Sequence, residues 1–94
     1  MQDIDDKYNE RADDHIKLSN NQLKGVSLAN VSASTMFAST RFSVWVSATE
    51  FKTSDKMKAD RNGIINYYTT EYKTMFEEHL DDYIKNFDQY MNVK

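Results

Sequence analysis

The sequence of 94 residues contains no cysteine, no proline and only two glycines, Gly25 and Gly63. The lack of cysteine excludes a disulfide scaffold, a thiolate zinc site and cysteine catalysis. Two glycines are too few for a glycine-rich phosphate loop or a dinucleotide-binding fingerprint. Because proline and glycine are the usual chain breakers, their scarcity favours a few long helices.

Charge is mildly acidic, with 12 basic and 15 acidic side chains and a net charge of −3. The chain lacks the basic patch of nucleic-acid-binding proteins and the polybasic face that attracts a helix to anionic membranes. We therefore expect a soluble protein that binds neither nucleic acid nor membrane. The length predicts one domain, residues 1–94. Residues 26–49 have the length of a membrane span, but their many hydroxyl side chains and Arg41 favour a buried helix.

The hydrophobic periodicity predicts three helices, over about 3–24, 33–52 and 55–91. Gly25 follows the first helix, where a left-handed C-terminal cap is expected. Ser32 is the predicted N-cap of the second helix, and Thr53 and Ser54 begin the start signal of the third. The predicted fold is all-α, an antiparallel bundle of three long helices.

The second helix has a β-strand as its alternative. Residues 42–49 alternate between apolar and hydroxyl side chains and are rich in strand-forming types. A single strand without a partner elsewhere in the chain would leave its hydrogen-bonding groups unpaired, which favours the helix.

The third predicted helix is too long for its neighbours. An unbroken helix from Asp55 to Met91 measures about 55 Å, whereas the first two helices measure about 30 Å each. The third helix is therefore bent or split, near Gly63 or near His79–Asp82, or its end packs on another subunit. Because that end carries an apolar face, we expect a homodimer or higher homo-oligomer. The predicted core and interface residues are Phe42, Trp45, Tyr83, Phe87 and Met91.

A calcium-loop pattern covers residues 58–69. Asp60 and Asn62 occupy positions where an EF-hand places oxygen ligands. Lys58 stands where the first carboxylate is needed, and Thr69 stands where the loop needs a bidentate glutamate. Asp60 and Asn62 are thus weak metal candidates, and a metal-responsive protein is the alternative function.

No arrangement of residues in the sequence predicts catalysis. His15 and His79 lack the Glu-x-x-His spacing of a di-iron bundle, and each is expected to be a half-buried helix residue. The hydroxyl side chains have no strand–turn–helix elbow that would expose a nucleophile. We therefore predict no catalytic residue, no cofactor and no enzymatic activity.

Four stretches resemble a family of short, uncharacterised bacterial proteins with a domain of unknown function. They are residues 11–16, residues 31–34 together with 40–42, residues 57–61 and residues 80–91. The resemblance implies a small, cytoplasmic helical protein with no established activity and no recognised catalytic residues. The sequence thus predicts a small soluble, non-enzymatic helical protein that self-associates.

Overall fold

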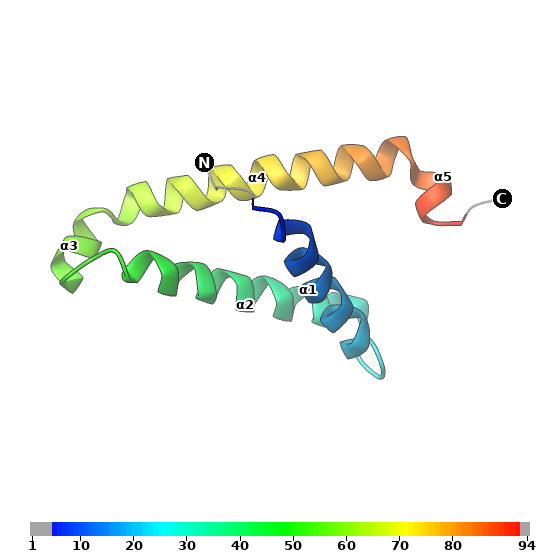
Figure 1. Cartoon of the computed structure of the whole chain (residues 1–94), viewed down its shortest axis with the longest axis horizontal. Helices are drawn as coiled ribbons and strands as arrows, with labels where there is room; N and C mark the ends of the chain where they lie inside the picture. The colour runs from blue at the N-terminus through cyan, green and yellow to red at the C-terminus, as the bar shows by residue number, and fades with distance from the viewer. Residues whose placement is uncertain (1–4, 93–94) are drawn as a thin grey trace. The chain divides into compact units, whose positions relative to one another are not determined.

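The computed structural model describes residues 5–92, which form helices and turns without a β-strand (Figure 1). The helices are α1 (Tyr8–Gln22), α2 (Leu28–Ala48), α3 (Ser54–Ala59), α4 (Arg61–Lys85) and α5 (Phe87–Tyr90). The chain divides between Val46 and Ser47 into two compact units. Unit 1 holds α1 and most of α2, and unit 2 holds α3, α4 and α5. The all-α prediction is confirmed, and the strand alternative is wrong because residues 42–48 are helical.

Helix α1 is shorter than the predicted range of 3–24, of which residues 3 and 4 lie outside the described part. It ends at Gln22, and a turn leads to Gly25. Gly25 has a φ of +84°, which is the left-handed conformation predicted for this position. The turn is held by a hydrogen bond of 3.4 Å from the amide of Val26 to the carbonyl of Leu23.

Helix α2 begins at Leu28, so the predicted start at residue 33 is wrong. The side chain of Ser27 accepts a hydrogen bond of 3.1 Å from the amide of Asn30 and satisfies one of the free donors of the first turn. Ser32, the predicted N-cap, lies inside the helix. The helix ends at Ala48 rather than near residue 52, because the chain turns through hydrogen bonds from Glu50 and Phe51.

Unit 1 is held together along one face of α2. Val31 is 6% exposed and is the one buried hydrophobic side chain within residues 5–92. One turn later, the hydroxyl oxygen of Thr35 lies 3.2 Å from that of Ser19 on α1. Ser19 in α1 and Leu23 at its C-terminal end are half-buried and lie one turn apart. Val31 therefore lies on the face of α2 that turns toward α1.

In unit 2, the predicted third helix is divided at Asp60, three residues before Gly63. Asp60 has φ −95° and ψ 6°, and its carbonyl accepts the amide of Ile64 at 3.0 Å. Gly63 itself is helical, in the first turn of α4. A second division occurs at Asn86, whereas residues 79–82, the other predicted position, continue the helix.

The start signal predicted at Thr53 is confirmed. Thr53 has an extended backbone, and its hydroxyl oxygen accepts the amide of Lys56 at 3.2 Å as the N-cap of α3. Because α3 has only six residues, this single cap is a large part of what stabilises it.

Replacing Thr53 with alanine should destabilise α3 by about 1 kcal/mol, because the amide of Lys56 loses its partner. The Cα chemical shifts of residues 54–59 would move toward coil values. Thr40→Ala is the matched control: the Thr40 hydroxyl only donates back to the carbonyl of Met36 within α2. That variant should be neutral or slightly stabilising, since alanine forms helices better. Equal losses of helix in both variants would contradict the assignment of the cap.

Candidate interaction surface

Helix α2 presents large apolar side chains to solvent. Phe42 and Trp45 are 65% and 62% exposed, and their rings contact each other at a centroid distance of 5.8 Å. Leu28 and Phe37 are still more exposed. Residues 28–48 include no acidic side chain, and Arg41 is their one charged residue. Helix α2 is therefore an apolar surface with a single positive charge.

Helix α4 carries a second exposed surface, which we call the α4 stripe. Its members follow one another at alternating steps of four and three residues, the spacing of helices that pack in pairs. The α4 stripe consists of Ile65, Thr69, Tyr72, Phe76, His79 and Tyr83. Its four apolar members are between 45% and 54% exposed, and the rings of Tyr72 and Phe76 lie 5.8 Å apart.

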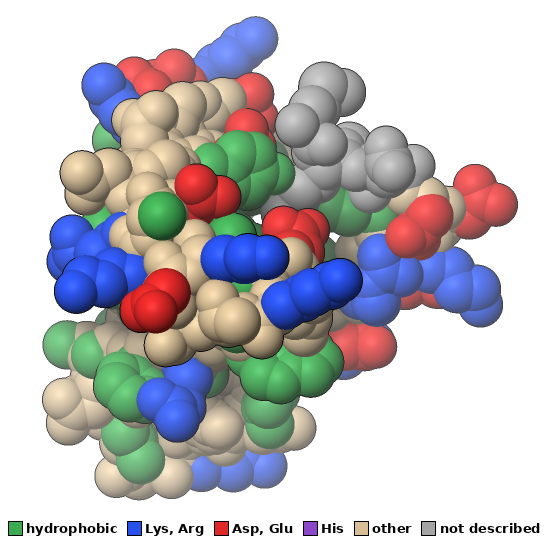
Figure 2. Space-filling view, turned by 90° about the vertical axis from the view of Figure 1, so that its left-hand side faces the viewer, with side chains coloured by type: hydrophobic (Ala, Val, Ile, Leu, Met, Phe, Trp, Pro, Cys, Tyr) green, Lys and Arg blue, Asp and Glu red, His purple; other side chains and the backbone are tan. Residues whose placement is uncertain are grey.

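The neighbouring face of α4 is more enclosed. Ile64, Tyr68 and Glu71 are half-buried, although they lie next to members of the α4 stripe in the sequence. Helix α4 therefore has a half-buried face beside an outer apolar face. In the space-filling view, hydrophobic side chains reach the surface among charged ones (Figure 2).

The five predicted core and interface residues all lie at the surface. Phe42, Trp45, Tyr83, Phe87 and Met91 are between 49% and 65% exposed. None of them packs in a core, and their role in an interface stays a prediction. The sequence reasoning missed Ile65 and Phe76, although the alternating three- and four-residue spacing that includes them is visible in the sequence.

A polar cluster at the end of α4 positions the ring of Tyr90 beside that of Tyr83. The Asp82 carboxylate accepts the Tyr90 hydroxyl at 2.8 Å and the Asn86 amide group at 2.8 Å. The rings of Tyr83 and Tyr90 then lie 4.5 Å apart. The hydrogen bond to Asp82 raises the pKa of Tyr90, because only the neutral phenol can donate it. This cluster holds α5 against the last turn of α4.

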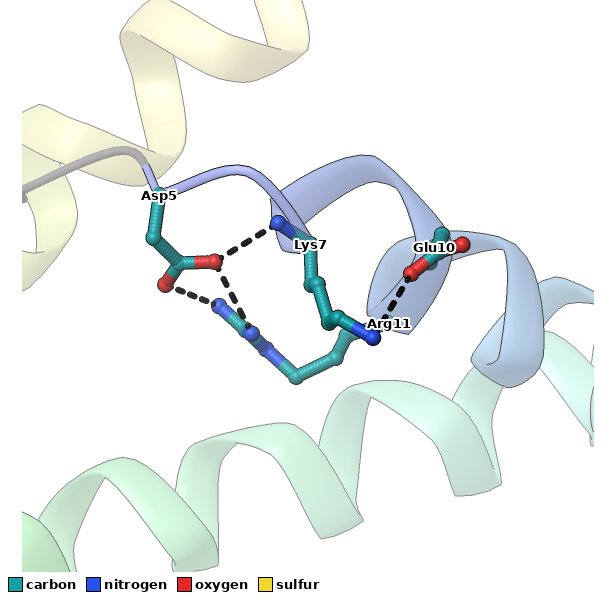
Figure 3. A network of polar contacts seen from close by, with 4 residues as sticks. All are labelled: Asp5, Lys7, Glu10 and Arg11. Carbon is teal, nitrogen blue, oxygen red and sulfur yellow. Dashed lines mark hydrogen bonds and ion pairs between the residues drawn. The ribbon is translucent and has the colours of Figure 1, made fainter.

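A second polar network lies at the start of α1 (Figure 3). Arg11 donates two hydrogen bonds to the Asp5 carboxylate, at 3.1 and 2.9 Å, and the amide of Lys7 donates a third at 2.9 Å. The side chain of Lys7 also lies 3.9 Å from Glu10. The hydrogen bonds from Arg11 and, to a smaller extent, the one from Lys7 lower the pKa of Asp5 from its ordinary 3.8.

The lowered pKa of Asp5 gives this network a defined pH dependence. A carboxyl whose pKa is lower in the folded chain stabilises the fold above its unfolded pKa, and that contribution is lost as pH falls through the folded value. We expect the NMR titration midpoint of the Asp5 carboxyl carbon below 3.8, and its return toward 3.8 in Arg11→Gln. Lys17→Gln, which changes an exposed cation outside the network, should leave the midpoint in place. An unchanged midpoint in Arg11→Gln would refute the pairing.

The loop-like segment 58–69 does not form a loop. Asp60 joins α3 to α4, and Asn62 lies in the first turn of α4. The Thr69 hydroxyl donates to the carbonyl of Ile65 at 2.8 Å within the helix. Helical geometry spreads these oxygens around the helix instead of converging them on one point. Within residues 5–92, no three His, Asp or Glu side chains are grouped so as to hold a metal ion.

The two histidines lie on different helices, His15 in α1 and His79 in α4, and both are exposed. The prediction that each is half-buried is therefore wrong. The prediction that residues 26–49 form a buried helix is also wrong, since Phe42 and Trp45 of α2 are 65% and 62% exposed. None of the described helices combines the length and apolarity that a membrane crossing requires.

Comparison with known proteins gives two matches. A family model described as "Protein of unknown function (DUF3144)" matches residues 8–84. The chain is also similar to the protein NB7890A from Shewanella sp., whose structure was determined by NMR. The two share 34% sequence identity over 99% of each chain, with a TM-score of 0.78. No curated protein matches the chain significantly.

Proposed function

We propose that this chain, which belongs to the DUF3144 family of proteins of unknown function, is a non-enzymatic helical interaction protein that self-associates through its apolar helix faces. The family match covers residues 8–84 and confirms the resemblance to an uncharacterised family. The similar protein comes from a bacterium, as the resemblance implied. A cytoplasmic location is part of the same proposal.

The observation that carries the proposal is the distribution of large hydrophobic side chains. Within residues 5–92 Val31 is the one hydrophobic side chain that is buried, whereas 21 large ones are exposed. Burial of apolar surface stabilises by about 25 cal/mol per Å². A protein that works as a monomer rarely leaves apolar patches larger than about 300–600 Å² in water. Association of copies removes this surface from water.

An antiparallel bundle of the long helices is the arrangement we propose for the assembled protein. Helices α1, α2 and α4 are the long ones, and short turns or the short helix α3 connect them. Short connections favour antiparallel neighbours. The half-buried face of α4, with Ile64 and Tyr68, would pack within the bundle, and the outer apolar face would remain for a partner.

The proposal is tested by light scattering coupled to gel filtration over a range of protein concentrations. We expect a mass of at least twice the 11.0 kDa of one chain, with dissociation on dilution. A truncated chain without residues 81–94 should associate more weakly, because it lacks Tyr83, Phe87 and Met91. Circular dichroism of the truncated chain checks that the remaining helices persist. A full-length chain that stays monomeric at millimolar concentration would refute self-association.

A further inference from the structure

We propose that the α4 stripe pairs with the α4 stripe of a second copy of this chain, antiparallel and with the twofold axis at Thr74. This inference rests on the proposed self-association and names the surface and the geometry that produce it. The stripe is exposed, extends along most of the 25 residues of α4 and has the spacing of a two-helix interface.

The stripe complements itself when the two helices run in opposite directions. With the twofold axis at Thr74, Tyr72 of one copy faces Phe76 of the other, because these residues lie two positions before and two positions after Thr74. Thr69 then faces His79, and Ile65 faces Tyr83. Each layer therefore joins one member of the stripe to another, and two of the three layers are fully apolar. Such self-consistent layers are what a twofold interface between identical helices requires.

The charges of α4 favour the same direction. Residues 61–73 carry two basic side chains, Arg61 and Lys73, and one acidic side chain. Residues 74–85 carry four acidic side chains and one basic side chain. Antiparallel pairing places the basic half of each helix beside the acidic half of the other. Parallel pairing would place the acidic halves side by side. Lys73 lies at the edge of the stripe, where solvent screens the repulsion between the Lys73 side chains of the two copies.

The apolar surface of α2 fits a second copy less well. Its exposed residues Phe37, Arg41 and Trp45 are spaced one turn apart and share a face. Antiparallel pairing of this face would centre on Arg41 and bring two guanidinium groups together. Since α2 contains no carboxylate, these charges would be desolvated without a partner.

The area of the α4 stripe suits a dimer. A fully buried aromatic side chain removes about 150–250 Å² from water, so Tyr72, Phe76 and Tyr83 at half exposure still offer about 100 Å² each. With Ile65 and the adjacent Leu80, the stripe supplies roughly 500 Å² per copy. Flanking side chains such as Met75 extend this toward the ~800 Å² per partner of a specific interface.

The direction of pairing is tested with spin labels on the full chain, which has no native cysteine. Lys73→Cys and Lys85→Cys are matched variants, since both replace an exposed lysine of α4 with a labelled cysteine. In the antiparallel pair the two Lys85 positions are about 33 Å apart along the helix axis, whereas the two Lys73 positions are nearly level. Pulsed dipolar spectroscopy should give about 40 Å for position 85 and about 20 Å for position 73.

Two other results would each overturn the inference in a distinguishable way. A distance at position 85 clearly shorter than about 40 Å, with position 73 still near 20 Å, would show a parallel pair. Long distances at both positions would show that a different surface pairs, although self-association would stand. No dipolar signal in either variant at high concentration would refute the self-association as well.

A charge placed in the stripe provides an independent check. Phe76→Glu puts a carboxylate against Tyr72 of the other copy and should raise the dimer dissociation constant about 30-fold or more. Thr74→Glu places the same charge on the side of α4 opposite the stripe and should leave the dissociation constant within about threefold of the unmodified protein. Sedimentation equilibrium measures both, and circular dichroism checks that both remain helical. Equal dimerisation of the two variants would refute the α4 stripe as the interface.

Discussion

Shortening Val31 to alanine should destabilise unit 1 by about 1.5–2 kcal/mol, a large effect for so small a unit. Val31 is 6% exposed and lies one turn before Thr35, whose hydroxyl oxygen is 3.2 Å from that of Ser19 on α1. Removing two methyl groups forfeits about 0.8 kcal/mol of transfer free energy each and leaves a small cavity. The higher helix propensity of alanine offsets about 0.5 kcal/mol of this loss. Helix α1 should lose its support on α2.

Hydrogen exchange measures this effect helix by helix. We expect the amides of α1 to exchange roughly tenfold faster in Val31→Ala than in the unmodified protein. Val44→Ala makes the same substitution in the same helix at a side chain that is 52% exposed. At a concentration where the chain is monomeric, that control should change stability by less than about 0.5 kcal/mol. Equal effects of the two variants would show that Val31 is not what holds α1 to α2.

The two glycines should respond to alanine in opposite directions. Gly25 has a φ of +84°, where an added Cβ strains the backbone by about 1–2 kcal/mol. Gly63 is in the first turn of α4, where alanine should stabilise by about 0.5–1 kcal/mol because it restricts the unfolded chain. Apart from the adjacent residues and the helix's own backbone, no atom lies within 4 Å of a Cβ built at either position, so packing does not contribute. The expected difference between the variants is about 2 kcal/mol.

Urea unfolding followed by circular dichroism gives this difference directly. Gly25→Ala should lower the denaturation midpoint, and Gly63→Ala should raise it. Gly25→Asn is a useful third variant, since asparagine tolerates the left-handed conformation better than alanine and should recover part of the loss. A neutral Gly25→Ala would contradict the left-handed cap after α1.

The all-helical class, the end of α1 and the start of α3 could be predicted from local signals. Gly25 and Thr53 act through their own backbone and side chain, so their roles do not depend on distant residues. The start of α2 was mispredicted because Ser27 and Ser32 are equally good caps in isolation. Helix formation from Leu28 buries Val31 in the contact with α1, and this tertiary contact is absent from a local pattern.

The candidate surface could be predicted only in part for a related reason. Ile64 and Ile65 are adjacent on α4 and begin two neighbouring stripes with almost the same period. Periodicity shows that both stripes are apolar, but it does not show which one is enclosed. In the structure Ile64 is half-buried, whereas Ile65 is exposed with Phe76 on the outer face. Gly63 likewise suggested that the predicted third helix is divided, but it did not give the position of the division, which is Asp60.

The scarcity of buried hydrophobic side chains also has a calorimetric consequence. The heat-capacity change of unfolding comes mainly from apolar surface that becomes hydrated, and a compact domain of this length would show about 1.1–1.4 kcal/mol/K. Because Val31 is the one buried hydrophobic residue of the described chain, a single copy should show a much smaller heat-capacity change on unfolding. Its helices would then melt gradually, whereas the assembled protein would melt over a narrow temperature range. The steepness of the thermal transition should therefore increase with protein concentration.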